Sequence, residues 1–166
     1  KIPDALLAVW STEPAASLPQ VDCATSLQPQ SRPDGSGRVI LPDDVWRMVE
    51  FCIEGWRQPV TTFIDHSSPM YELQFNRYTR GGISSPVCVL SKDGGQKYLD
   101  YYSLPPHVEL HRVKSARYVA YPDKNASSYE ISPSLIPVVC YTCAALVYEI
   151  LGRPEQAAAM LRCIVR

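Results

Sequence analysis

The fold is decided by the stretch Pro86-Val-Cys-Val-Leu-Ser-Lys-Asp-Gly-Gly-Gln-Lys-Tyr-Leu-Asp-Tyr-Tyr102. Its two halves are rich in β-branched, aromatic and other apolar residues, which favour strands. Between them lies Asp93-Gly94-Gly95, and glycines readily adopt the positive φ angles that a tight hairpin turn requires. The stretch therefore predicts an antiparallel β-hairpin.

The residues around this hairpin also favour strands. The segment from His111 to Tyr121 has the two-residue alternation of a strand, with Arg112 and Lys114 on one face and Arg117 on the other, so it predicts a strand with one basic face. The segment from Leu41 to Trp56 is ambiguous. Its apolar residues fit one face of a helix, but its β-branched and aromatic centre also fits a strand, and local physics does not decide between the two.

The end of the chain has a helical pattern instead. Residues 138–151 are almost wholly apolar, Gly152 suits the position after a helix end, and Pro154 suits the first turn of a second helix. We expect a helical hairpin over about residues 134–165, with its first helix buried on most sides. Together with a sheet or small barrel over about 39–121, this predicts an α+β fold.

The beginning of the chain is rich in proline. Five of the fifteen prolines lie in residues 1–38, and this part predicts a short helix from about Asp4 to Trp10 followed by an irregular, extended arm. Residues 39–166 are then expected to form a single α+β domain. An arm of this length is unusual in a compact monomer, which suggests that a neighbouring subunit holds it.

Composition excludes several classes of protein. The chain has 166 residues, of which 46% are hydrophobic and 20% charged, with a net charge of −1. These values are typical of a globular protein rather than a disordered tail or a nucleic-acid wrapper. The longest uncharged run, residues 131–148, contains Pro133 and Pro137 and several hydroxyl groups, so we expect no membrane span.

The small net charge conceals two opposed blocks. Residues 39–72 contain two basic and six acidic residues, a net charge of −4, whereas residues 77–117 contain seven basic and three acidic residues, a net charge of +4. If the blocks lie on different faces, copies of the chain would attract one another head to tail. An ordinary solvated mixture of charges is the alternative, and binding of phosphate groups by the basic block is a weaker one.

We find no catalytic signature and expect neither an enzyme nor a bound metal or cofactor. Cys140-Tyr-Thr-Cys143 matches a redox motif, but it lies inside an apolar helix, so reduced, buried thiols are expected for it and for the other four cysteines. A thiol redox or metal-binding protein that uses this pair remains an alternative. His66, His107 and His111 are expected to be solvated, and Asp43, Asp44 and Asp65 to cap local structure rather than to bind a cation.

The order of several segments is similar to that of a known family. These segments are Asp34-Gly-Ser-Gly37, Val39 to Met48, Glu54-Gly-Trp-Arg-Gln-Pro-Val60, Ser68 to Gly81, Pro86-Val-Cys-Val89 and the final Ala-rich helices. Over residues 34–166 the chain resembles the head-to-tail connector proteins, called ring or adaptor proteins, of short-tailed phages. The resemblance is greatest to those of crAss-like Bacteroidales phages. Residues 11–31 match nothing in it.

The resemblance implies a strand over roughly residues 45–54. It also implies a structural virion protein, assembled in the bacterial host cytoplasm, whose copies form a ring that is often twelvefold beneath the portal protein. Such a ring extends the channel for double-stranded DNA without reading its sequence and docks the next tail component. A protein-interaction domain unrelated to viruses is a further alternative.

We expect the ring interface to include basic residues facing an acidic surface of the neighbour, with tryptophans as core or interface anchors. The candidates are Arg112, Lys114, Arg117, Asp43, Asp44, Trp46 and Trp56.

Overall fold

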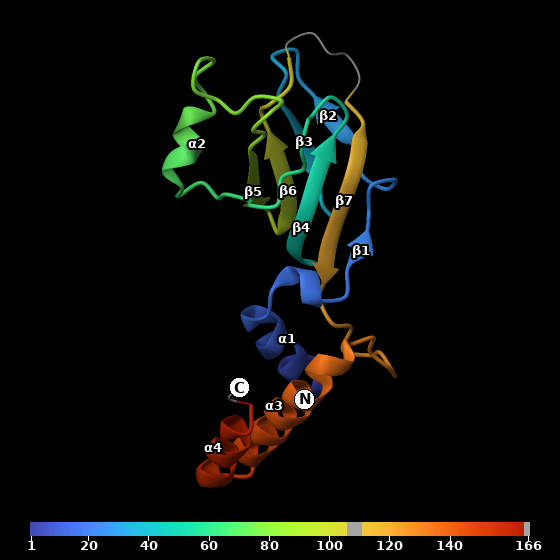
Figure 1. Cartoon of the computed structure of the whole chain (residues 1–166), viewed down its shortest axis with the longest axis vertical. Helices are drawn as coiled ribbons and strands as arrows, with labels where there is room; N and C mark the ends of the chain where they lie inside the picture. Colours follow the sequence, from blue (N-terminus) through green and yellow to red (C-terminus); the bar gives the residue numbers. More distant parts are fainter. Residues whose placement is uncertain (106–110, 165–166) are drawn as a thin grey trace. The chain divides into compact units, whose positions relative to one another are not determined.

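The computed structural model describes residues 1–105 and 111–164, which divide into two compact units (Figure 1). Residues 20–119 form the first, here called the β unit. Residues 1–19 and the residues from 120 onward form the second, here called the helical unit. The predicted boundary after residue 38 does not coincide with this division, because short segments before residue 38 pair with strands of the β unit.

The β unit contains two antiparallel sheets, and together with the helices of the helical unit they confirm the predicted α+β fold. One sheet has the strand order β1-β7-β4 and the other the order β2-β3-β6-β5. A long excursion between β4 and β5 carries the short helix α2 (Pro69–Leu73) (Figure 1). The strands are β1 (Val21–Asp22), β2 (Pro29–Ser31), β3 (Gly37–Ile40), β4 (Val45–Ile53), β5 (Cys88–Asp93), β6 (Gln96–Tyr101) and β7 (Val113–Ala120).

The predicted hairpin is confirmed as β5 and β6. Asp93 pairs with Gln96, which leaves Gly94 and Gly95 as a two-residue turn with φ angles of +55° and +93°. Two positive φ angles match the right-handed twist of the flanking strands. The same register places Lys92 directly opposite Lys97.

The ambiguous segment is a strand, β4, as the family resemblance implied. It lies beside β7, and the N–H of Glu54 just beyond it donates to the carbonyl of Arg112 at 2.9 Å. The rings of Phe51 and Trp56 lie 6.3 and 6.1 Å from the ring of Tyr101 on β6. These three buried aromatic side chains therefore connect the two sheets in one core.

The irregular N-terminal arm is not confirmed. Residues 2–12 form α1 (Ile2–Thr12), which begins before Asp4, so Asp4 lies in the first turn and does not cap the helix. A 3-10 turn, η1 (Ala15–Ser17), follows. Val21 then pairs with Tyr118 on β7, and β2 pairs with β3. The segment is used to complete two sheet edges, which would otherwise expose unpaired backbone groups.

The predicted helical hairpin is confirmed in the helical unit. It consists of η2 (Pro133–Leu135), α3 (Ile136–Ile150) and α4 (Pro154–Arg162), and α3 packs against both α1 and α4 (Figure 1). Gly152 has a φ of +68°, and the N–H of Arg153 donates to the carbonyl of Tyr148 at 2.9 Å. This arrangement is the Schellman motif that a glycine after a helix end favours.

The expected burial of α3 is wrong. Of its fifteen residues, only Val139 and Ala145 are buried. The helix is apolar almost all round, but α1 and α4 cover only part of its circumference, so several large apolar side chains remain exposed. The apolar composition correctly predicted a helix, but it did not predict how much of that helix is exposed to solvent.

Candidate functional site

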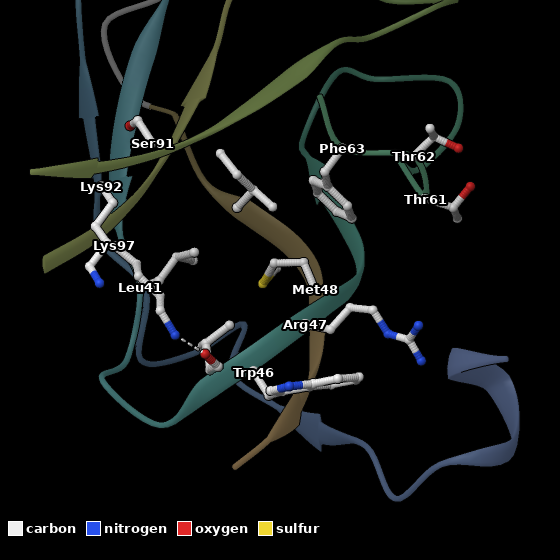
Figure 2. A pocket seen from close by; sticks show the side chains of 12 residues that line it. Leu41, Trp46, Arg47, Met48, Thr61, Thr62, Phe63, Ser91, Lys92 and Lys97 are labelled. Carbon is white, nitrogen blue, oxygen red and sulfur yellow. Dashed lines mark hydrogen bonds between the residues drawn. The ribbon is translucent and has the colours of Figure 1, made fainter. Parts of the chain in front are cut away.

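The β unit has a pocket of about 520 Å³ whose interior is apolar (Figure 2). Leu41 at the end of β3, Met48 on β4 and Leu90 on β5 contribute to its lining, and the first two are buried. The corner between β3 and β4 is fixed by β6, because the N–H of Leu41 donates to the carbonyl of Lys97 at 3.0 Å. A volume of this size is in the range of ligand and side-chain binding pockets.

The chain after β4 supplies another wall of this pocket. Val60 forms a bridge with Phe51, and Ile64 forms a parallel bridge with Val89 on β5. These two bridges hold Thr61, Thr62 and Phe63 across the opening between β4 and β5. Figure 2 shows the Phe63 ring facing the interior of the pocket from this segment.

Three basic side chains surround the apolar interior. Lys92 and Lys97 lie together at one side of the pocket, and Arg47 lies at the other, where its guanidinium stacks 4.8 Å from the Trp46 ring centroid (Figure 2). No acidic residue is among the described residues that line the pocket. We call it the basic-rimmed pocket; it is lined by Leu41, Val45, Trp46, Arg47, Met48, Thr61, Thr62, Phe63, Leu90, Ser91, Lys92 and Lys97.

The electrostatics of Lys97 favour an acidic partner. Burial lowers the pKa of its ammonium, and the charge of Lys92 directly opposite lowers it further, while Asp44 and Asp43 raise it by smaller amounts. Its ammonium already donates to the carbonyl of Val45. Like charges in register on neighbouring strands repel each other, so a carboxylate beside them would be stabilised.

A second surface lies on the helical unit. A groove of about 820 Å³ runs along α3 and is lined largely by apolar side chains. Within it, Ile136 is 47% exposed, Val147 41% and Leu151 61%. The segment Pro133–Ile150 is also long and apolar enough to cross a membrane, by length and composition alone. We call this surface the α3 groove; it is lined by Ile2, Ser127, Ser128, Tyr129, Ile131, Ile136, Val139, Cys140, Cys143, Ala144, Val147, Tyr148 and Leu151.

The cysteines are all free, but they are not all buried as expected. Cys23, Cys52 and Cys88 are buried, and burial is the main cause that raises the pKa of each of these thiols. Cys140 is exposed and Cys143 is half-buried, because both lie on the side of α3 that borders the groove. Cys163 is exposed as well.

Two of the predicted interface residues are engaged within the chain. Arg117 on β7 donates to the carboxylate of Glu50 on β4 at 2.6 Å, and this hydrogen bond is the largest cause that lowers the pKa of Glu50. Asp44 accepts from the hydroxyl of Tyr118 at 3.0 Å. The acidic and basic blocks of the sequence therefore meet within one sheet at the Arg117–Glu50 ion pair.

The other predicted interface residues are divided between surface and core. Arg112, Lys114 and Asp43 are exposed. Trp46 is half-buried and lines the basic-rimmed pocket. Trp56 is buried, with its ring 5.9 Å from that of Phe51, so it is a core residue rather than an exposed anchor.

Groups that could support metal binding or acid–base chemistry are scattered. Among the described residues no three His, Cys, Asp or Glu side chains come close enough to hold a metal ion. His66 is exposed as expected, but His111 is buried, and its Nδ1 lies 2.5 Å from the hydroxyl of Tyr101. His107 lies outside the described residues.

Sequence reasoning missed the basic-rimmed pocket. Its walls come from segments that are far apart in the chain, and only the pairing of strands and the packing of the two sheets bring these segments together. One signal was available: the predicted hairpin turn already places Lys92 opposite Lys97.

No family model matches the chain, and no curated protein is similar to it at a significant level.

Proposed function

We propose that this chain is a structural subunit whose copies assemble into a ring in the portal–tail connector of a phage virion. The ring would extend the channel for double-stranded DNA and dock the next tail component, with no catalytic role for the chain. The order of segments over residues 34–166 supports the connector assignment, because it is similar to that of ring and adaptor proteins.

The observation that carries the assembly is the exposure of α3. A helix without a charged residue from Ile136 to Tyr148 leaves Ile136, Val147 and Leu151 open to solvent in the single chain. Contiguous apolar surface of this kind marks an interaction site in proteins that function in water. Burial in an assembly would remove the cost of exposing it, at roughly 25 cal/mol per Å² of apolar surface.

The experiment measures the mass of the particle. We expect the purified chain, alone or with its portal protein, to form a closed ring that mass photometry and electron microscopy detect. Val147→Glu places a charge in the α3 groove and should shift the population toward monomer. Val21→Glu is the matched control, because Val21 on β1 has the same 41% exposure and lies outside the groove. If the wild-type chain stays monomeric both alone and with its portal protein, the proposal is contradicted.

A further inference from the structure

The hairpin between α3 and α4 ends in an exposed apolar tip with acidic flanks. Ile150 is 65% exposed and Leu151 61%, and the carboxylates of Glu149 and Glu155 on either side are exposed too. Arg153 lies between them, so the tip has a net charge of −1 from two acids and one base. We call residues 149–155 the hairpin tip.

The hairpin tip has a defined backbone conformation. The Schellman hydrogen bonds from Gly152 to Glu149, at 3.0 Å, and from Arg153 to Tyr148, at 2.9 Å, end α3. Pro154 then begins α4. Because the turn is held in one conformation, little conformational entropy is lost when it binds, which favours its use as a recognition element.

The basic-rimmed pocket has the complementary chemistry. Its interior of Leu41, Met48 and Phe63 would accept an aliphatic side chain, and its rim carries Lys92 and Lys97 on adjacent strands. The repulsion between these two ammonium groups, one of them partly desolvated, would be relieved by a carboxylate. No other protein needs to be invoked, since the chain itself offers an aliphatic side chain beside a carboxylate.

We propose that the hairpin tip of one copy inserts Ile150 into the basic-rimmed pocket of a second copy, with Glu149 beside Lys92 and Lys97. This inference rests on the proposed ring, and it adds which surfaces meet. The two surfaces differ, so the contact is heterologous: each copy uses its tip on one neighbour and its pocket on the other. Contacts of this type generate rings when the rotation between copies closes.

The test is a charge exchange in the full chain. Glu149→Lys and Lys92→Glu each replace an attraction by a repulsion at exposed positions, so both variants should fold and each should raise the half-assembly concentration about tenfold. The double variant restores opposite charges and should recover most of the assembly. Ile150→Ser removes the inserted side chain without disturbing a core and should weaken assembly by a similar factor.

Matched controls use the same substitutions elsewhere. Glu72→Lys on α2 and Lys124→Glu in the helical unit alter exposed charges at residues that line neither the basic-rimmed pocket nor the α3 groove, and they should leave the half-assembly concentration unchanged. If the wild-type chain assembles and the tip and pocket variants assemble equally well, this inference is wrong and the proposed ring stands. If each single variant weakens assembly but the double variant does not restore it, the proposed pairing of Glu149 with Lys92 is also wrong. A wild-type chain that never assembles contradicts both proposals.

Discussion

At the scale of single residues, the β unit depends on glycines whose backbone conformation disfavours a side chain. Gly35 has a φ of +83°, and its N–H and carbonyl are both hydrogen-bonded, to Arg32 and Leu104. A Cβ at this position would lie 2.0 Å from the carbonyl oxygen of Leu104. Gly95 in the β5–β6 turn has a similar φ of +93°, but a Cβ there would meet nothing within 4 Å.

This pair of glycines separates the cost of the backbone conformation from the cost of the clash. Gly95→Ala should destabilise the β unit by about 1 kcal/mol, the usual penalty for a side chain in the left-handed region. Gly35→Ala should cost about 3 kcal/mol, because the backbone of Leu104 must also move. Urea unfolding monitored by circular dichroism measures both values. Equal unfolding midpoints for the two variants would show that contact between a Cβ at position 35 and the Leu104 backbone does not add to the cost of the substitution.

At the scale of elements, the sequence predicted those parts whose determinants are local. The β5–β6 hairpin was predictable because Asp93-Gly94-Gly95 specifies its turn, and the α3–α4 hairpin because Gly152 and Pro154 end and begin helices. In contrast, β4 has buried residues at Val45, Met48 and Phe51, a spacing of three that resembles a helix. Only its pairing with β7, about sixty residues later in the chain, makes it a strand.

The elements that the sequence did not predict are short or depend on surroundings. Strands β1 and β2 have two and three residues, which is too few to show a period. The exposure of α3 could not be predicted because apolar composition is the same for a core helix and for an interface helix. The basic-rimmed pocket needed the same non-local information, since Phe63 reaches it through bridges to two different strands.

The contrast between sheet and helix predicts two classes of thiol. Cys140 and Cys163 are exposed on the helical hairpin and should react with Ellman's reagent in the native protein. Cys88 on β5 should react only after unfolding, because burial excludes the reagent and holds the pKa of this thiol well above its usual range. Burial likewise raises the pKa of Cys23 to about 11. Rapid modification of Cys88 under native conditions would contradict this assignment.

The same titration reports on assembly. Cys140 lines the α3 groove and should become protected in the proposed ring, whereas Cys163 lies outside the residues that line the groove. Loss of reactivity at Cys140 alone would therefore locate the interface. If Cys140 remains fully reactive in assembled particles, the groove is not covered.

At the scale of the whole molecule, the two units differ in how the chain builds them. The β unit is one continuous segment, whereas the helical unit combines both ends of the chain, with α1 packed on α3. Joining segments separated by about a hundred residues carries a loop-closure cost. The pairing of Val21 with Tyr118 inside the β unit brings the two connecting segments together, so folding of the β unit offsets that cost.

This asymmetry predicts that the helical unit depends on a folded β unit, whereas the β unit does not depend on the helical unit. A matched pair of substitutions tests this. Leu6 on α1 and Leu99 on β6 are both fully buried, and truncation of either to Ala should cost about 2–5 kcal/mol. Hydrogen exchange followed by mass spectrometry should show that Leu6→Ala accelerates exchange in α3 and leaves β6 unchanged. Leu99→Ala should accelerate exchange in both α3 and β6, because opening of the β unit also breaks the Val21–Tyr118 pairing that brings the segments leading to α1 and α3 together. If Leu6→Ala accelerates β6 to the same extent as α3, the chain unfolds as one unit and the asymmetry is wrong.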